Sequence, residues 1–176
     1  MSITLQKALE ADKTILGNLY SLYLHDLSKF TLQIDIGEDG FFHFEDLETF
    51  WKVDGISPFF IKENMTIIGF LLLLERPFLK KEMDFGINDL FILNKYKGKG
   101  LGRRAVKELF QEKQGKYFVI ELVENKPAVL FWKKLYKELH INFEERAELI
   151  DEEPCLIQTF HIPKETAVEF NESGMS

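Results

Sequence analysis

Residues 87–109 constrain the local structure of the chain more than any other stretch. Leu90–Leu93 is a short apolar run of the kind expected of a buried strand. Gly98, Gly100 and Gly102 follow at every second position, and from Leu101 the apolar residues recur with the spacing of one helical face. The stretch therefore predicts a strand, a tight glycine turn and an amphipathic helix in direct succession.

The glycine turn is expected to bind an anion. Backbone N–H groups at the start of a helix lack intrahelical acceptors, and the helix dipole adds positive potential, so such turns commonly bind phosphate. Lys97, Lys99, Arg103 and Arg104 add four positive charges to this segment, whereas the whole chain has a net charge of −7. A local charge opposite to the overall charge favours a specific anionic ligand.

Three kinds of phosphate-binding loop can be compared with this segment, besides an ordinary strand-to-helix turn without a ligand. A P-loop ends in a lysine followed by serine or threonine, which the segment lacks. A dinucleotide loop needs Gly-x-Gly-x-x-Gly and an acid about twenty residues later. Glu121 and Glu124 lie near that distance, but the glycine spacing differs. Lys97–Gly102 instead resembles the Gln/Arg-x-x-Gly-x-Gly/Ala signature of the GCN5-related N-acetyltransferases, with Lys97 in the first position.

A second block adds to this resemblance. Tyr117–Val123 is another short apolar run, as expected of a central strand. An amphipathic stretch follows that is similar to the family's Asn-x-x-Ala-x-x-Phe-Tyr motif and contains Asn125, Pro127, Ala128, Phe131 and Trp132. Pro127 suits the first turn of a helix. Trp132 departs from the motif, because the family usually has tyrosine at this position.

The expected fold is a mixed α/β (α+β) domain over residues 1–162, followed by a polar tail at 163–176. The pattern predicts a strand at 3–5, a helix at 8–29, a hairpin at 58–75, the two motif blocks, and strands at 142–150 and 155–162. The resemblance implies a mostly antiparallel sheet with helices on both faces and a splayed central pair of parallel strands. The aromatic-rich segment 34–55, with a short helix at 47–51, is interpreted either as an insertion or lid, or as ordinary hydrophobic packing. Gly69 indicates a bulge or a close backbone approach.

The resemblance implies an N-acetyltransferase that uses acetyl-CoA as co-substrate and transfers the acetyl group directly to a primary amine. Backbone groups of the first strand would hold the pantetheine arm, the glycine loop would hold the pyrophosphate, and the second block would contact the arm from the other side. The residues concerned are Leu90, Phe91, Ile92, Lys97, Gly98, Lys99, Gly100, Leu101, Gly102, Arg103, Asn125 and Trp132.

The catalytic groups are less well defined by the sequence. Asp89 occupies a position where the family often has an acid, and Glu121 is an ionisable group in an apolar strand, where burial raises a carboxyl pKa. Glu121 is alternatively a strand-end acid that faces solvent. Tyr136, one helical turn after Trp132, is the candidate proton donor to the leaving thiolate, or an ordinary packing residue. Tyr23, His25 and Asp26 are the candidate acceptor contacts, because the family's acceptor pocket borders this region.

Composition and hydropathy limit the expected location and partners of the protein. Cys155 is the only cysteine, so an intrachain disulfide is excluded and a cytoplasmic location is expected. The first residues lack a signal-peptide core, and the longest apolar run is too short to span a bilayer.

The acidic chain disfavours nucleic acid as a partner, and no metal site is expected. The partners considered are a small-molecule or peptide amine and, optionally, a second copy of the chain. A non-catalytic acyl-CoA-binding module is the main alternative function; a nucleotide-binding oxidoreductase is disfavoured because a second βαβ unit is lacking.

Overall fold

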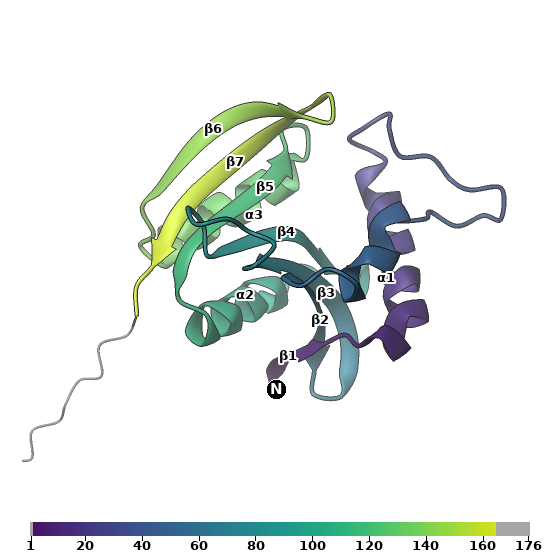
Figure 1. The fold of residues 1–176 in the computed structure, drawn as a ribbon, viewed down its shortest axis with the longest axis horizontal. Coiled ribbons are helices and arrows are strands. Elements are labelled where there is room, and N and C mark those ends of the chain that lie inside the picture. The colour runs from purple at the N-terminus through teal and green to yellow at the C-terminus, as the bar shows by residue number, and fades with distance from the viewer. Residues whose placement is uncertain (1, 165–176) are drawn as a thin grey trace, which may run out of the picture.

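The computed structural model describes residues 2–164, which form one mixed sheet with helices on both faces (Figure 1). The strand order is β1-β2-β3-β4-β5-β7-β6, and β4 pairs with β5 in parallel whereas the other neighbours are antiparallel. The predicted fold class, a mostly antiparallel sheet with one central parallel pair, is confirmed. Of the tail expected at 163–176, residues 165–176 lie outside the described part.

The strands and helices have the following bounds. The strands are β1 (Ile3–Lys7), β2 (Ile56–Glu63), β3 (Thr66–Glu75), β4 (Phe85–Ile92), β5 (Gly115–Leu122), β6 (Phe143–Ile150) and β7 (Glu153–Ile162). The α-helices are α1 (Lys13–Leu27), α2 (Leu101–Glu112) and α3 (Lys126–Glu138), and short 3-10 helices occur at Glu10–Asp12, Glu45–Trp51 and Asn94–Tyr96.

Two apolar clusters cover the two faces of the sheet. On the first face, α2 and α3 pack against residues such as Ile87, Tyr117 and Val119, and we call this the α2–α3 face. On the second face, α1 and the 3-10 helix at Glu45–Trp51 pack against residues such as Phe70 and Leu72, and we call this the α1 face. Successive residues of a strand point to opposite faces, so each strand contributes to both clusters.

The first helix differs from the expected range of 8–29. The Asp12 side chain accepts a hydrogen bond from the Leu9 N–H at 2.9 Å, which closes a separate turn before α1. The helix therefore begins at Lys13 and ends at Leu27.

Both features expected at Gly69 are present. The register of β2 against β3 shifts beside it, between Ile61 and Lys62. A Cβ at this glycine would lie 1.9 Å from the Phe91 carbonyl oxygen, so β4 can approach only because position 69 has no side chain.

None of the helices in residues 2–164 is long and apolar enough to cross a membrane.

Candidate active site

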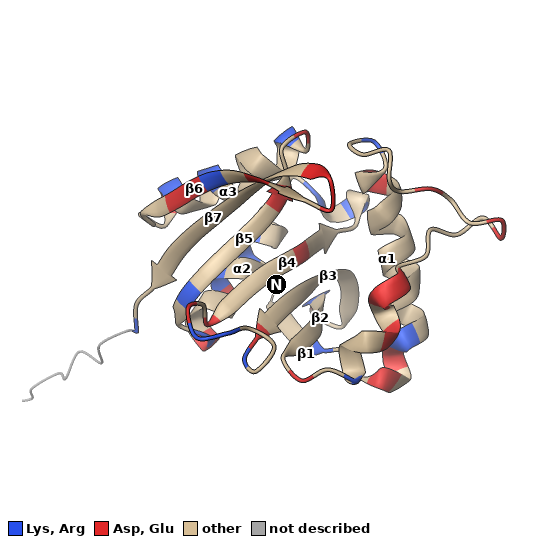
Figure 2. Cartoon of the chain, turned by 45° about the horizontal axis from the view of Figure 1, so that its top comes forward, with Lys and Arg blue, Asp and Glu red and all other residues tan. Residues whose placement is uncertain are grey.

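The two parallel strands at the centre of the sheet separate part-way along their length. Phe85–Ile87 of β4 pair with Tyr117–Val119 of β5, and within the described residues their pairing stops there. Beyond this point the two strands diverge (Figure 2). In the open part of β4, Leu90 and Ile92 face α2 and α3 whereas Phe91 faces α1. We call this separation the opening; along it, the edge of β4 that faces β5 has no strand partner within the described residues.

The glycine loop lies at the end of β4 that borders this opening. Gly98 and Gly100 have positive φ angles of 76° and 74°, which glycine adopts at little cost. A Cβ at Gly98 would meet nothing within 4 Å, so the backbone there is open to a ligand. The helical bond from Arg104 N to Gly100 O is 3.1 Å long, and the N–H groups of the preceding first-turn residues have no intrahelical acceptor. The loop thus has the form of an anion site.

Two of the predicted cofactor-binding cations are paired with acids from other helices. Lys97 Nζ lies 3.1 Å from Asp26 Oδ2 at the end of α1, and Arg103 lies 3.0 Å from Glu138 on α3. Lys99 lies over the Tyr96 ring at 5.9 Å. The Lys97–Asp26 pair brings a predicted cofactor residue into contact with a predicted acceptor residue.

A β-bulge determines where Asp89 points. Leu73 pairs with Ile87 and Leu72 pairs with Asp89, so Asn88 is an extra residue in β4. With regular alternation Asp89 would share the α2–α3 face with Ile87; the extra residue turns it to the α1 face. Asp89 lies where β4 leaves β5, and it is only 9% exposed.

Three donors surround the Asp89 carboxyl. Tyr20 Oη donates to Oδ2 at 2.9 Å, Tyr23 Oη donates to Oδ1 at 3.1 Å, and Asn88 Nδ2 is 3.4 Å from Oδ2. Burial raises the pKa of Asp89, and these three hydrogen bonds oppose the rise. Burial and the nearby carboxylate in turn raise the pKa of both phenols well above the usual value. Asp89 is therefore a buried carboxyl whose ionised form is supported by donors.

Glu121 on β5 has the opposite surroundings. It keeps regular alternation with Tyr117 and Val119, so it faces α3 and not α1, and it is 6% exposed. Burial raises the pKa of Glu121 to about 8. The neighbouring Gln158 side chain opposes this rise in part. Neither carboxyl oxygen of Glu121, however, has a hydrogen-bond partner within the part of the chain that the structure describes. In Figure 2, β4 and β5 each contain a red acidic segment, and the only acids within their bounds are Asp89 and Glu121. Both were predicted site residues, and they face opposite sides of the sheet.

Comparison with known proteins establishes the family. The sequence model of the Acetyltransferase (GNAT) family matches residues 19–136. The chain belongs to this family. The resemblance predicted from the two motif blocks is thereby confirmed, and membership indicates acyl-CoA-dependent acetyl transfer. A search of curated proteins gives no significant match.

Solved GNAT structures share the fold at low sequence identity. An acetyltransferase from Thermus thermophilus superposes with a TM-score of 0.65 at 17% identity, over 90% of this chain and 96% of that one. The ribosomal-protein-S18-alanine N-acetyltransferase from Escherichia coli gives 0.58 at 13%, over 95% and 98%. The yncA protein from Salmonella typhimurium, solved with its cofactor acetyl-CoA, gives 0.55 at 14%, over 95% and 98%. These likenesses concern the fold.

The second GNAT block is more deeply packed than its motif suggests. Trp132 is 4% exposed and its ring lies 6.1 Å from that of Tyr136. Tyr136 is fully buried, and its hydroxyl donates to Gln158 Oε1 at 2.8 Å. This placement does not favour Tyr136 as a proton donor to a thiolate in the opening. Asn125 caps α3 by accepting a hydrogen bond from the Ala128 N–H at 3.3 Å, with Pro127 in the first turn as predicted.

The remaining predicted acceptor residues lie near the end of α1. His25 and Asp26 border a cavity of about 520 Å³ together with Phe91 and residues of the loop after β4. His25 also lies 5.6 Å from the Phe42 ring. Tyr23 contacts Asp89 and not this cavity, so the three predicted acceptor residues divide between two places.

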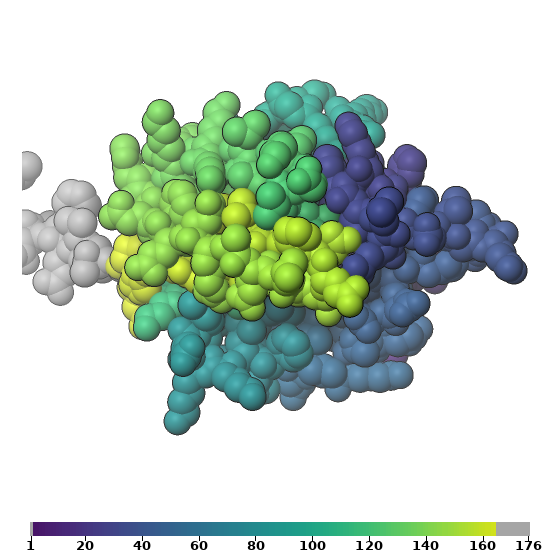
Figure 3. Space-filling view, turned by 90° about the horizontal axis from the view of Figure 1, so that it is seen from above, coloured from purple at the N-terminus to yellow at the C-terminus, as the bar shows by residue number. Residues whose placement is uncertain are grey.

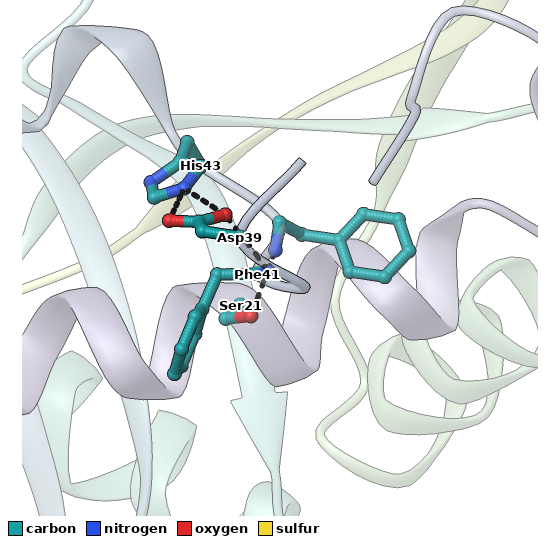
Figure 4. A network of polar contacts seen from close by, with 5 residues as sticks. Ser21, Asp39, Phe41 and His43 are labelled. Atoms are coloured by element: carbon teal, nitrogen blue, oxygen red, sulfur yellow. Dashed lines mark hydrogen bonds and ion pairs between the residues drawn. The ribbon is translucent and has the colours of Figure 1, made fainter. Parts of the chain in front are cut away.

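The segment at 34–55 is fastened to α1. Within the segment, Asp39 accepts hydrogen bonds from His43 Nε2 at 2.7 Å and from the Phe41 N–H at 3.1 Å. Figure 4 shows this network beside Ser21 of α1. The Phe42 N–H donates to Ser21 Oγ at 3.0 Å. Phe44 stacks on Tyr20 at 4.5 Å, which agrees with the packing interpretation of these aromatics.

One contact across the opening has no signal in the sequence. Thr31 Oγ1 donates to Glu153 Oε1, and Gln33 Nε2 donates to the Asp151 carbonyl at 2.9 Å. Seen from above, the β6–β7 tip accordingly lies against the segment that follows α1 (Figure 3). These residues are about 120 positions apart in the chain, so only the folded topology brings them together.

Proposed function

We propose that this protein transfers an acetyl group from acetyl-CoA directly to a primary amine. The observation that carries the proposal is the separation of β4 from β5 directly before a glycine-opened helix. This arrangement offers a strand edge to an amide-containing arm and an anion site to a pyrophosphate. Acetyl-CoA supplies the activated acetyl group as a thioester.

The glycine loop and the open strand edge would hold acetyl-CoA. The first-turn N–H groups of α2 and the loop N–H groups would bind the pyrophosphate, and Lys97, Lys99 and Arg103 would contribute positive charge. The backbone of Leu90–Ile92 would pair with the pantetheine arm. The open space around Gly98, where a Cβ would meet nothing within 4 Å, supports this assignment.

Asp89 is the general base in this proposal. It lies where the strands part and faces α1, from which two of its hydrogen-bond donors come. An amine attacks only after it loses a proton, and a positioned carboxylate can accept that proton directly or through water. Burial raises the pKa of Glu121 to about 8, but its side chain faces α3 on the other side of the sheet, away from the α1 side on which the candidate acceptor residues lie.

Transfer is direct in this proposal, without an acetyl-enzyme. Cys155 is 5% exposed, and burial raises the pKa of its thiol, so the reactive thiolate is disfavoured. The amine therefore attacks the thioester itself. A cytoplasmic location and a homodimer remain proposals that the single cysteine and the family allow.

The test measures thiol release from acetyl-CoA with a panel of primary amines and identifies the acetylated product by mass spectrometry. A Gly98→Asp variant should bind acetyl-CoA at least about tenfold more weakly, because a carboxylate would face the pyrophosphate. The matched control is Gly40→Asp. Gly40 also has a positive φ, 82°, and a Cβ there also meets nothing within 4 Å, so both substitutions strain the backbone alike.

Equal acetyl-CoA affinity in the wild type and in Gly98→Asp would refute the cofactor site. A second candidate function is a non-catalytic acyl-CoA-binding module, which the buried Trp132 in the usual tyrosine position favours. Acetyl-CoA binding that Gly98→Asp abolishes, without turnover of any amine, would support the module instead of the enzyme.

A further inference from the structure

Two tyrosines of α1 donate hydrogen bonds to the candidate base, Asp89. Tyr20 and Tyr23 are three residues apart and so project from one side of the helix. Their hydroxyls reach different oxygens of the same carboxylate, Oδ2 from Tyr20 and Oδ1 from Tyr23. The Asn88 bulge supplies the other half of the arrangement, because it turns Asp89 toward α1.

Aromatic packing fixes both phenol rings. Tyr20 is fully buried and lies 4.3 Å from Phe70 and 4.5 Å from Phe44. Tyr23 is half-buried and lies edge-on to Phe70 at 5.5 Å and tilted against Phe91 at 5.8 Å. Each hydroxyl is therefore held in place before any substrate arrives.

Provided that the proposed function holds, we propose that Tyr20 and Tyr23 are positioning residues for the acetyl transfer: they hold the Asp89 carboxylate ionised and fix its orientation on the α1 face. The surroundings of Asp89 explain why its carboxylate needs these two donors. The groups that act on Asp89 are the two phenols from α1 and Asn88 from its own strand. Its β3 partner, Leu72, is apolar. No cation is among the groups that act on Asp89 within the described residues, so neutral donors have to offset burial.

The experiment compares Tyr20→Phe, Tyr23→Phe and the double variant with the wild type. Losing one donor to a buried carboxylate should move the acidic limb of the kcat/KM profile upward by about one pH unit, and losing both should move it further. A ¹³C NMR titration of aspartate-labelled protein, with the Asp89 signal assigned from Asp89→Asn, should give the same shifts without any substrate.

The control is Tyr117→Phe. Tyr117 is as fully buried as Tyr20, and its hydroxyl donates to the Lys113 carbonyl at 2.6 Å. The substitution therefore also removes one hydrogen bond, but not one to Asp89. It should destabilise the protein without moving the acidic limb or the Asp89 titration. Tyr23→Phe, at a half-buried position, covers the case in which Tyr20→Phe fails to fold.

The outcomes separate the two proposals. Amine turnover with an unchanged acidic limb and an unchanged Asp89 titration would overturn the role of the tyrosines alone. A shifted Asp89 titration in a protein that turns over no amine would overturn the proposed function, and with it the catalytic use of the pair. Turnover with both shifts supports the inference.

Discussion

Asp89 and Glu121 lie on neighbouring strands beside the same opening, and both are almost completely buried, at 9% and 6% exposure. Their surroundings nevertheless differ in kind. The Asp89 carboxyl accepts hydrogen bonds from two phenols and one amide. The Glu121 oxygens have no partner within residues 2–164, and Glu145 across the neighbouring strands raises its pKa further by repulsion.

The comparison distinguishes two effects on a carboxyl pKa, that of burial and that of nearby hydrogen-bond donors. Burial raises the pKa of both carboxyls, because removing a charge from water is costly whatever surrounds it. At Asp89 three side-chain donors oppose the rise, although the pKa stays above its ordinary value; at Glu121 Gln158 and Lys133 oppose it, and the pKa reaches about 8. The two carboxyls therefore differ in the hydrogen-bond donors around them and not in the depth of their burial.

The largest effect expected from this comparison concerns activity. Asp89→Asn should lower kcat/KM by about 10²- to 10⁴-fold, the usual loss when a general base is removed. Glu121→Gln should keep the wild-type rate, because a mostly protonated carboxyl is replaced by a neutral side chain of similar shape. Steady-state kinetics of both variants with one accepted amine gives the answer.

Acetyl-CoA affinity, measured by calorimetry, is the control for both variants and should stay unchanged. A large loss in Glu121→Gln together with an active Asp89→Asn would reverse the assignment. It would also show that hydrogen-bond donors are a poor guide to the base in this fold.

The next effect concerns stability and pH. The pKa of Glu121 is about 8 in the folded protein against an ordinary value of 4.5. Between these pH values the folded state binds a proton that the unfolded state does not, so the stability contributed by the neutral acid is lost as pH rises. Each pKa unit is worth about 1.4 kcal/mol at most; allowing for partial access of water, we expect the wild type to lose about 2 kcal/mol more than Glu121→Gln between pH 5 and pH 8.

Urea unfolding at several pH values measures this difference. The matched control is Glu124→Gln, which removes a carboxyl from an exposed position on the turn after β5 and should leave the pH dependence as it is in the wild type. Parallel stability curves for the wild type and Glu121→Gln would mean that Glu121 is ionised inside the fold.

The sequence predicted the frame of this site better than the direction of its side chains. The glycine loop and the two central strands follow from local patterns, since apolar runs and glycines act over a few residues, whereas the parallel pairing of the strands was implied by the family resemblance. Strand alternation alone places Asp89 on the same face as Ile87, and only the bulge at Asn88, which depends on pairing with β3, changes this. Alternation does hold for Glu121, but its lack of partners depends on β6, β7 and α3.

The site features that the sequence did not predict depend on contacts between residues far apart in the chain. Tyr20 was not among the predicted site residues, because it lies 69 positions from Asp89 and has the spacing of an ordinary core residue. Tyr23 was predicted as an acceptor contact, and the structure adds a bond to the candidate base. A tyrosine pair at i and i+3 on an otherwise apolar helical face was the available signal for both.

The smallest expected effect tests whether α3 takes part in the chemistry on the Glu121 side of the sheet. Tyr136 donates to Gln158, which in turn donates to Glu145 at 2.9 Å, so its hydroxyl belongs to a buried chain of hydrogen bonds. Tyr136→Phe leaves Gln158 Oε1 without this donor and should lower the free energy of unfolding by about 1 kcal/mol, with kcat retained. Trp132→Tyr, which restores the family's usual residue, is the companion variant and should change kcat little if water protonates the thiolate. A loss in kcat of about ten- to a hundredfold in Tyr136→Phe, at unchanged KM for acetyl-CoA, would instead make Tyr136 the general acid and α3 a catalytic element.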